Sequence, residues 1–282
     1  MYEATRSEIL KRLRAQVAAG KPIIGGGAGT GLSAKCAEAG GIDLIIIYNS
    51  GRFRMGGRGS LSGMMPYGDA NQIVMDMARE VIPIVKRTPV LAGVCGTDPF
   101  REMKLFLRDL KALGFNGIQN FPTVGLIDGT FRIGLEETGM GYGLEVDAVK
   151  LAADMDLLTC PYVFSVEDAV AMTKAGADVL IPHMGLTTKG MIGATTALTL
   201  KESLEGFKKM SRTRRRPFAP ISWFSAMEDP SHGDAQYILE NTDGVVGFFR
   251  GLQRGAAPHG TGDHRPGTSV QATSLQRLIT WL

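Results

Sequence analysis

The chain contains 282 residues, of which 44% are hydrophobic and 21% are charged, and its formal net charge is +3. This length allows one large globular domain with a full core, or two small ones. The small net charge gives no support to nucleic-acid binding, and no apolar run approaches the ~20 residues that span a bilayer. Three widely spaced cysteines indicate neither a disulfide framework nor a zinc site. We therefore expect a soluble, cytoplasmic protein without a membrane or nucleic-acid partner.

Short apolar runs alternate with amphipathic segments along most of the chain. The runs predict strands at 23–24, 44–48, 90–94, 117–120, 158–164, 179–182, 218–223 and 245–249. The segments predict helices at 6–19, 32–39, 71–86, 103–113, 144–155, 165–176, 201–210 and 234–241. Such an alternation over ~250 residues predicts an α/β fold, a (β/α)8 TIM barrel with an N-terminal capping helix.

The first predicted turn from strand to helix is rich in glycine, at residues 25–31. Such a turn lets the backbone approach a ligand closely, so Gly26 and Gly27 are candidate substrate-binding residues. The same glycines raise the alternative of an open, doubly wound sheet. Against it, their spacing does not match the dinucleotide-binding fingerprint, and no acidic residue ends the second predicted strand.

The segment that follows the second predicted strand, residues 49–60, is the most distinctive of the chain. Asn49 and Ser50 end the strand, and Arg52 and Arg54 then alternate with glycines. On the carboxyl-terminal rim of a barrel, guanidinium groups and free backbone N–H donors would bind an anion. The alternative is a flexible, solvated loop.

Polar residues also stand at the ends of other predicted strands. His183 directly follows a strand and is a candidate acid, base, ligand or oxyanion donor. Asn120 ends another strand. Cys95 is either a nucleophile or a small buried hydrophobic side chain. Asp98 precedes a proline, so a helix N-cap explains it without a function.

Acidic residues on the predicted rim loops are further candidates. Glu136 and Glu137 are either a charge complement to a helix dipole or a proton-transfer pair. Glu228 precedes an Asp-Pro pair, in which Asp229 repeats the capping pattern and leaves Glu228 the freer acid.

Six strings then stand in a specific order: YNSGRFRMGGRG (48–59), PYGDAN (66–71), AGVCGTDPF (92–100), QNFPTVGLIDG (119–129), LEETGMGY (135–142) and HMGLTT (183–188). They resemble the phosphoenolpyruvate hydrolase-like family, also described as TIM-barrel signal-transduction proteins. The resemblance implies a barrel of the phosphoenolpyruvate/pyruvate superfamily, whose members are often homo-oligomeric and use a divalent metal.

The resemblance also implies an activity, hydrolase or lyase chemistry on a small phospho- or phosphono-2-oxo acid such as phosphonopyruvate. In this interpretation Arg52 and Arg54 hold the anionic group, and Asn49 and Asn120 orient a carboxylate or enolate oxygen. His183 or Glu137 moves the proton. Asp98 with Glu228 would hold Mg²⁺, which prefers carboxylate oxygens and water.

The resemblance weakens in the last part of the chain. Residues 219–230 and 250–260 depart from the strings that the family would have after the seventh and eighth strands. We therefore predict one barrel domain at 1–249 and an atypical tail at 250–282, and hypothesise that the tail and residues 211–230 are read out of frame. Barrel enzymes often bind phosphate at these two loops, so their loss would weaken ligand binding or inactivate the protein. The alternatives are thus a non-catalytic barrel that binds or senses a small anion, and a structural remnant.

Overall fold

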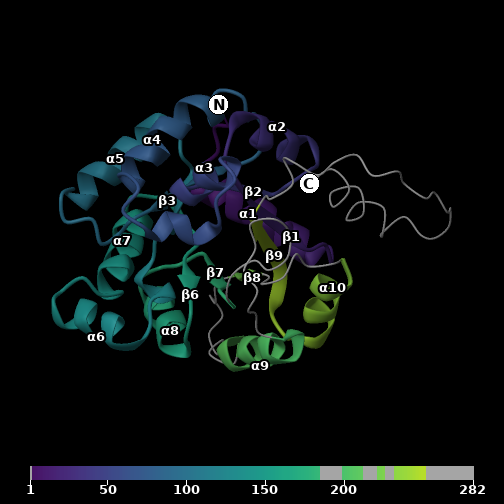
Figure 1. Cartoon of the computed structure of the whole chain (residues 1–282). Coiled ribbons are helices and arrows are strands. Elements are labelled where there is room, and N and C mark those ends of the chain that lie inside the picture. The colour runs from purple at the N-terminus through teal and green to yellow at the C-terminus, as the bar shows by residue number, and fades with distance from the viewer. Residues whose placement is uncertain (1, 185–198, 212–220, 226–231, 252–282) are drawn as a thin grey trace.

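The computed structural model describes residues 2–184, 199–211, 221–225 and 232–251 (Figure 1). The strands run parallel in one curled sheet with the order β5-β4-β3-β2-β1-β9-β8-β7-β6. They are β1 (Ile23–Ala28), β2 (Leu44–Ile47), β3 (Val90–Val94), β4 (Gly117–Asn120), β5 (Leu158–Thr159), β6 (Tyr162–Val163), β7 (Val179–Pro182), β8 (Ile221–Ser225) and β9 (Val245–Gly251).

Helices surround this sheet (Figure 1). They are α1 (Arg6–Ala18), α2 (Gly31–Ala39), α3 (Asn49–Met55), α4 (Ala70–Val81), α5 (Met103–Leu113), α6 (Gly129–Glu137), α7 (Gly143–Asp154), α8 (Val166–Lys174), α9 (Leu200–Ser211) and α10 (His232–Asn241), with short 3-10 turns η1 (Ser60–Met64) and η2 (Val124–Leu126). No helix among these described segments has the length and apolar character to cross a membrane.

Two apolar clusters hold the fold together. The larger lies between the sheet and the outer helices, and includes Ile45, Val74 and Leu107. The smaller fills the concave side of the sheet, where Ile9 and Leu13 of α1 pack against strand side chains such as Leu44, Ile46, Leu91 and Leu158. The helix predicted at 6–19 is present as α1, and its apolar side chains belong to the inner cluster.

The strand predicted at 158–164 is split into β5 and β6. Cys160 and Pro161 separate the two pieces, and proline has no N–H group to give to a ladder. The side chain of Asn120 replaces the missing backbone pairing, since its Oδ1 accepts from Tyr162 N at 2.6 Å and its Nδ2 donates to Tyr162 O at 3.3 Å. Asn120, predicted to be catalytic, thus joins two strands.

Most of the predicted elements are confirmed, with three corrections in the first part of the chain. Residues 25–27, predicted as a glycine-rich turn, belong to β1 and pair with β2 and β9 on either side. Within residues 49–60, predicted as a loop, residues 49–55 form α3, and η1 begins at Ser60. The helix predicted at 71–86 ends at Val81, two residues before Pro83. The sheet also continues through β9 to Gly251, and the predicted tail beyond it lies outside the described residues.

Candidate functional site

The arginines and glycines after β2 form a helix that is packed tightly against the end of β1. A Cβ atom on Gly51 would lie 2.9 Å from the Ala28 carbonyl oxygen, and one on Gly29 would lie 2.1 Å from the Gly51 carbonyl oxygen. Both glycines are therefore required for the close approach of two backbone segments. This packing fixes α3 at the carboxyl end of β2.

Arg54 of α3 is buried, with 8% of its surface exposed. Its Nε and Nη2 groups have no hydrogen-bond partner among the described residues. The guanidinium lies beside the Tyr48 hydroxyl, and its charge also reaches Tyr162. Burial raises the pKa of both phenols, and the guanidinium opposes that rise. Because arginine remains protonated, a fixed positive charge is held here.

Tyr48, whose hydroxyl lies beside the Arg54 guanidinium, also belongs to the inner apolar cluster. Its ring lies 5.1 Å from that of Phe121, centroid to centroid. A Cβ atom on Gly27 would lie 2.4 Å from the Tyr48 hydroxyl oxygen, and one on Gly93 would lie 2.4 Å from the Tyr48 Cβ atom. Gly27 therefore makes room for a tyrosine, and Gly26 beside it is a paired strand residue.

Asn49 and Ser50, one turn before Arg54 on α3, are buried, with 2% and 1% of their surfaces exposed. The Asn49 amide donates to Gly63 O at 2.8 Å, and its Oδ1 accepts from Ser50 N at 2.8 Å. The Ser50 hydroxyl has no hydrogen-bond partner among the described residues. We call Tyr48, Asn49, Ser50, Arg54 and Tyr162 the mouth cluster, because they stand where the strands' carboxyl ends meet the inner cluster.

Arg52 does not belong to the mouth cluster. Its Nη2 group lies 3.0 Å from Glu80 Oε2, and the side chains of both residues are about two-fifths exposed, at 42% and 40%. The other oxygen of Glu80 accepts from Gly31 N at 2.6 Å, at the start of α2. The structure thus separates the two arginines that were predicted to act together.

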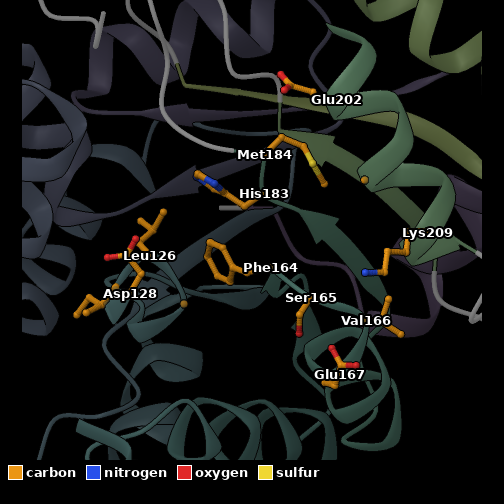
Figure 2. A pocket seen from close by; sticks show the side chains of 13 residues that line it. Leu126, Asp128, Phe164, Ser165, Val166, Glu167, His183, Met184, Glu202 and Lys209 are labelled. Atoms are coloured by element: carbon orange, nitrogen blue, oxygen red, sulfur yellow. The ribbon is translucent and has the colours of Figure 1, made fainter. Parts of the chain in front are cut away.

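A pocket of about 510 Å³ lies beside His183 (Figure 2). It lies between η2, the start of α8, the end of β7 and α9, and residues lining it include Asp128, Phe164, Glu167, His183, Glu202 and Lys209. The His183 ring lies 5.0 Å from that of Tyr162 and 5.3 Å from that of Phe164. His183 therefore links the pocket to the mouth cluster.

Removal from water lowers the pKa of His183 to about 4. The imidazole is consequently neutral near pH 7, and a neutral imidazole can accept a proton as well as donate a hydrogen bond.

Glu145 of α7, which the sequence reading did not single out, is completely buried behind Asn120. Its carboxylate accepts hydrogen bonds from Asn120 Nδ2 at 2.6 Å, Thr123 Oγ1 at 2.7 Å and Val124 N at 2.7 Å. Burial raises the pKa of Glu145 to about 7, although these donors act in the opposite direction. Asn120 is therefore fixed on one side by Glu145 and on the other by Tyr162.

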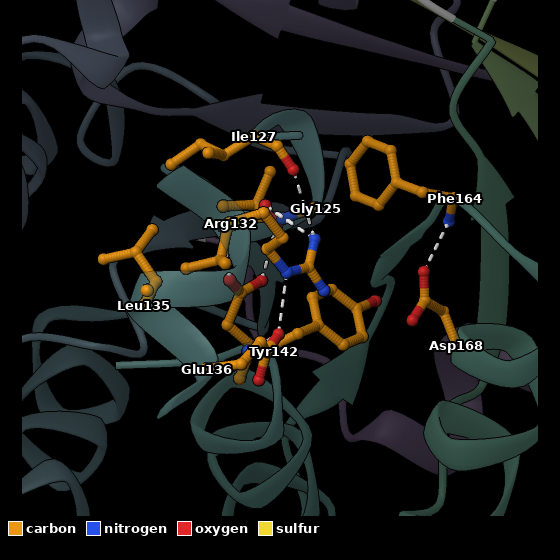
Figure 3. A network of polar contacts seen from close by, with 12 residues as sticks. Gly125, Ile127, Arg132, Leu135, Glu136, Tyr142, Phe164 and Asp168 are labelled. Atoms are coloured by element: carbon orange, nitrogen blue, oxygen red, sulfur yellow. Dashed lines mark hydrogen bonds and ion pairs between the residues drawn. The ribbon is translucent and has the colours of Figure 1, made fainter. Parts of the chain in front are cut away.

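Glu136 and Glu137 of α6, predicted as a pair, have different surroundings in the structure. Glu136 Oε1 lies 2.7 Å from Arg132 Nε and accepts from Tyr142 N at 3.2 Å (Figure 3). Arg132 in turn donates to Val124 O at 2.9 Å, so this network holds α6 onto η2. Glu137 is exposed on α6.

Of the two residues predicted to bind a metal, the structure describes Asp98. Asp98 accepts from Asn71 Nδ2 at 3.0 Å and from Phe100 N at 2.9 Å, and it pairs with Arg101. Although burial acts to raise it, these contacts together lower the pKa of Asp98. Glu228 lies outside the described residues.

Among the described residues, no three His, Cys, Asp or Glu side chains lie together as a metal-binding group. The carboxylate of Asp98, the described member of the predicted Mg²⁺ pair, is already engaged by Asn71, Phe100 and Arg101 and does not fit a metal site. Burial raises the pKa of Cys95, and its Sγ lies 3.6 Å from Thr97 Oγ1, which gives no sign of an activated thiolate.

The sequence was compared with protein families and with curated proteins, and the fold was compared with solved structures. A family model described as phosphoenolpyruvate hydrolase-like matches residues 8–254. The ToMV resistance protein Tm-1(GCR237) of Solanum lycopersicum is 55% identical over 253 residues, which is 86% of this chain and 32% of that protein. The chain thus spans about a third of the length of this curated relative.

Solved structures of several other proteins share the fold. Phosphonopyruvate hydrolase in complex with oxalate and Mg²⁺ has a TM-score of 0.55 at 19% identity, covering 87% of this chain and 80% of that one. The phosphoenolpyruvate phosphomutase of Streptomyces platensis subsp. rosaceus has a TM-score of 0.55 at 16% identity, covering 85% and 79%.

Proposed function

Since the chain belongs to the phosphoenolpyruvate hydrolase-like family, we propose that it binds a small phospho- or phosphono-2-oxo acid at the carboxyl ends of its strands and cleaves it by hydrolase or lyase chemistry. Solved structures of the same fold include a phosphonopyruvate hydrolase and a phosphoenolpyruvate phosphomutase. Both names support a reaction of this kind.

The architecture that we propose for this site is a complete (β/α)8 barrel. β5 and β6 stand at opposite ends of the strand order, yet only Cys160 and Pro161 separate them in the chain. The Asn120 side chain bonds across the same break. Counted as one strand, β5 and β6 would close an eight-stranded ring.

The main support for this proposal is the buried guanidinium of Arg54. A buried guanidinium with unpaired N–H groups is unfavourable unless another group completes its hydrogen bonds. An anionic ligand would do so, and the Ser50 hydroxyl beside it offers a further contact. The pocket beside His183 has the size of a small-molecule site. We place the ligand between Arg54 and His183.

His183 is the residue that we assign to proton transfer. In the hydrolysis of phosphonopyruvate, water attacks phosphorus, the carbon–phosphorus bond breaks, and a proton is delivered to the carbon to give pyruvate and phosphate. A neutral imidazole at the pocket can take the proton of the water. Glu137, the other predicted base, is exposed on α6 and is the weaker candidate.

A non-catalytic anion-binding barrel is the second candidate. The buried carboxylate of Glu145 already accepts three hydrogen bonds. Asp98 is likewise engaged. A site with a buried cation and a neutral imidazole is sufficient to bind an anion without turning it over.

Titration of phosphonopyruvate by calorimetry, together with an assay for released pyruvate, tests both candidates. The enzyme proposal expects Arg54→Met to weaken binding and turnover, and His183→Gln to abolish turnover while binding survives. Arg58→Met, which alters an exposed arginine just beyond α3, is the matched control. Binding without pyruvate release in the wild-type protein would favour the second candidate, and absence of both would refute the proposed function.

A further inference from the structure

Arg6 and Arg54 differ in whether the Nε and Nη2 groups of the guanidinium have hydrogen-bond partners. Arg6 grips Asp178 with its Nε and Nη2 groups, which lie 2.8 Å from Oδ2 and 2.8 Å from Oδ1. The Nε and Nη2 groups of Arg54 are buried and unpaired among the described residues. Those two N–H groups form a planar fork that matches the two oxygens of a carboxylate.

We propose that the Nε–Nη2 fork of Arg54 binds the carboxylate of the ligand directly, as Arg6 binds Asp178, and that this binding needs no divalent cation. The inference rests on the proposed function and names the group that the site recognises. It differs from what the metal-bound phosphonopyruvate hydrolase relative would suggest.

The electrostatics of the mouth cluster support this assignment. Besides the Tyr48 phenol, the charged group that influences the pKa of Tyr162 is Arg54, and Arg54 is also the charge that acts on Tyr48. The hydrogen bonds of Asn49 go to backbone atoms and not to an acid. A divalent cation beside these two phenols would meet the fixed positive charge of Arg54, and no carboxylate is among the groups that act on the pKa of Tyr48 or Tyr162. Such surroundings are unfavourable for a hard cation that prefers carboxylate oxygens.

The sequence limits what the remaining internal segments can add. Residues 185–198 and 212–220 contain no aspartate or glutamate, whereas 226–231 contains Glu228 and Asp229. Residues 252–282, which also lie outside the described part of the chain, contain Asp263. Glu228→Gln removes the acid that the sequence analysis assigned to the metal, and this makes it a test of that assignment.

The experiment is a calorimetric titration of the whole chain with oxalate, a planar dicarboxylate, in buffer with EDTA and in buffer with excess Mg²⁺. We expect equal affinities in the two buffers and no change in Glu228→Gln. Arg54→Met should weaken binding by about 10- to 100-fold, the effect of losing hydrogen bonds from a charged donor. Arg54→Lys, which keeps the charge and loses the fork, should also weaken it, whereas Arg58→Met should not.

The outcomes separate this inference from the function on which it rests. Oxalate binding that requires Mg²⁺, or that is lost in Glu228→Gln, would overturn the inference and leave the proposed function standing. Tighter binding of inorganic phosphate than of oxalate in a parallel titration, abolished by Arg54→Met, would overturn the carboxylate assignment alone. If oxalate, phosphate and phosphonopyruvate all fail to bind with or without Mg²⁺, the proposed function falls as well.

Discussion

A buried or half-buried arginine lies near each end of the strands, and the two arginines differ in their hydrogen-bond partners. Near α1, Arg6 is bound by Asp178 and by the carbonyl oxygens of Ala153 and Gly176. At the carboxyl ends of the strands, Arg54 is more deeply buried and has two unpaired N–H groups among the described residues. The paired arginine is part of the interactions that hold the folded structure together. The unpaired N–H groups of Arg54 are instead available to bind an anionic ligand, at a cost in stability.

The largest effect is expected from breaking the satisfied pair. Asp178→Ala should lower the free energy of unfolding by about 3 kcal/mol, because it leaves the Arg6 charge without its counter-ion and removes an acceptor of Thr159 N. Urea denaturation measures this. Asp154→Ala, in an exposed pair with Lys150, is the control and should cost less than about 0.5 kcal/mol. Similar losses in the two variants would contradict the contrast.

Glu145 is a third buried charge, and it tests whether hydrogen bonds alone can replace a counter-ion. Its pKa is about 7 in the folded protein and 4.5 in the reference state. Between these values the native state binds more protons than the unfolded state, so the contribution of Glu145 to stability falls as pH rises from 4.5 to 7, by at most about 3 kcal/mol. Urea denaturation across this range should show that slope in the wild type and a flatter one in Glu145→Gln. Equal slopes would show that Glu145 is ionised throughout.

The smallest effect, and one of opposite sign, is expected at Arg54. Arg54→Met should leave stability unchanged or raise it by about 1–2 kcal/mol, since it replaces an unpaired buried cation by an apolar side chain of similar length. Thermal and urea unfolding measure this without ligand. A loss of several kcal/mol would show that Arg54 is a structural residue, and would remove the basis for assigning it to a ligand.

The sequence allowed most of the fold to be predicted, because apolar periodicity and glycine at helix ends are local signals. The strand Val90–Val94 and the helix Met103–Leu113 were predicted with the bounds that the structure has. The same local signals failed at α3, where glycines suggested a loop. Gly51 is instead required by its contact with β1, a segment about twenty residues away in the chain, and no local pattern contains that information.

For the candidate site, too, the sequence predicted some features and the tertiary structure was needed for the others. The sequence by itself determined which residue types gather at the strand ends, including Asn49, Ser50, Arg54 and His183. Only the tertiary structure decided that Arg52 pairs with Glu80, whereas Nε and Nη2 of Arg54 have no partner among the described residues. It also decided that Asn120 joins two strands and that Glu145 is buried. The physical reason is that pairing and burial depend on which distant segments pack against a side chain, and those segments meet only when the sheet curls.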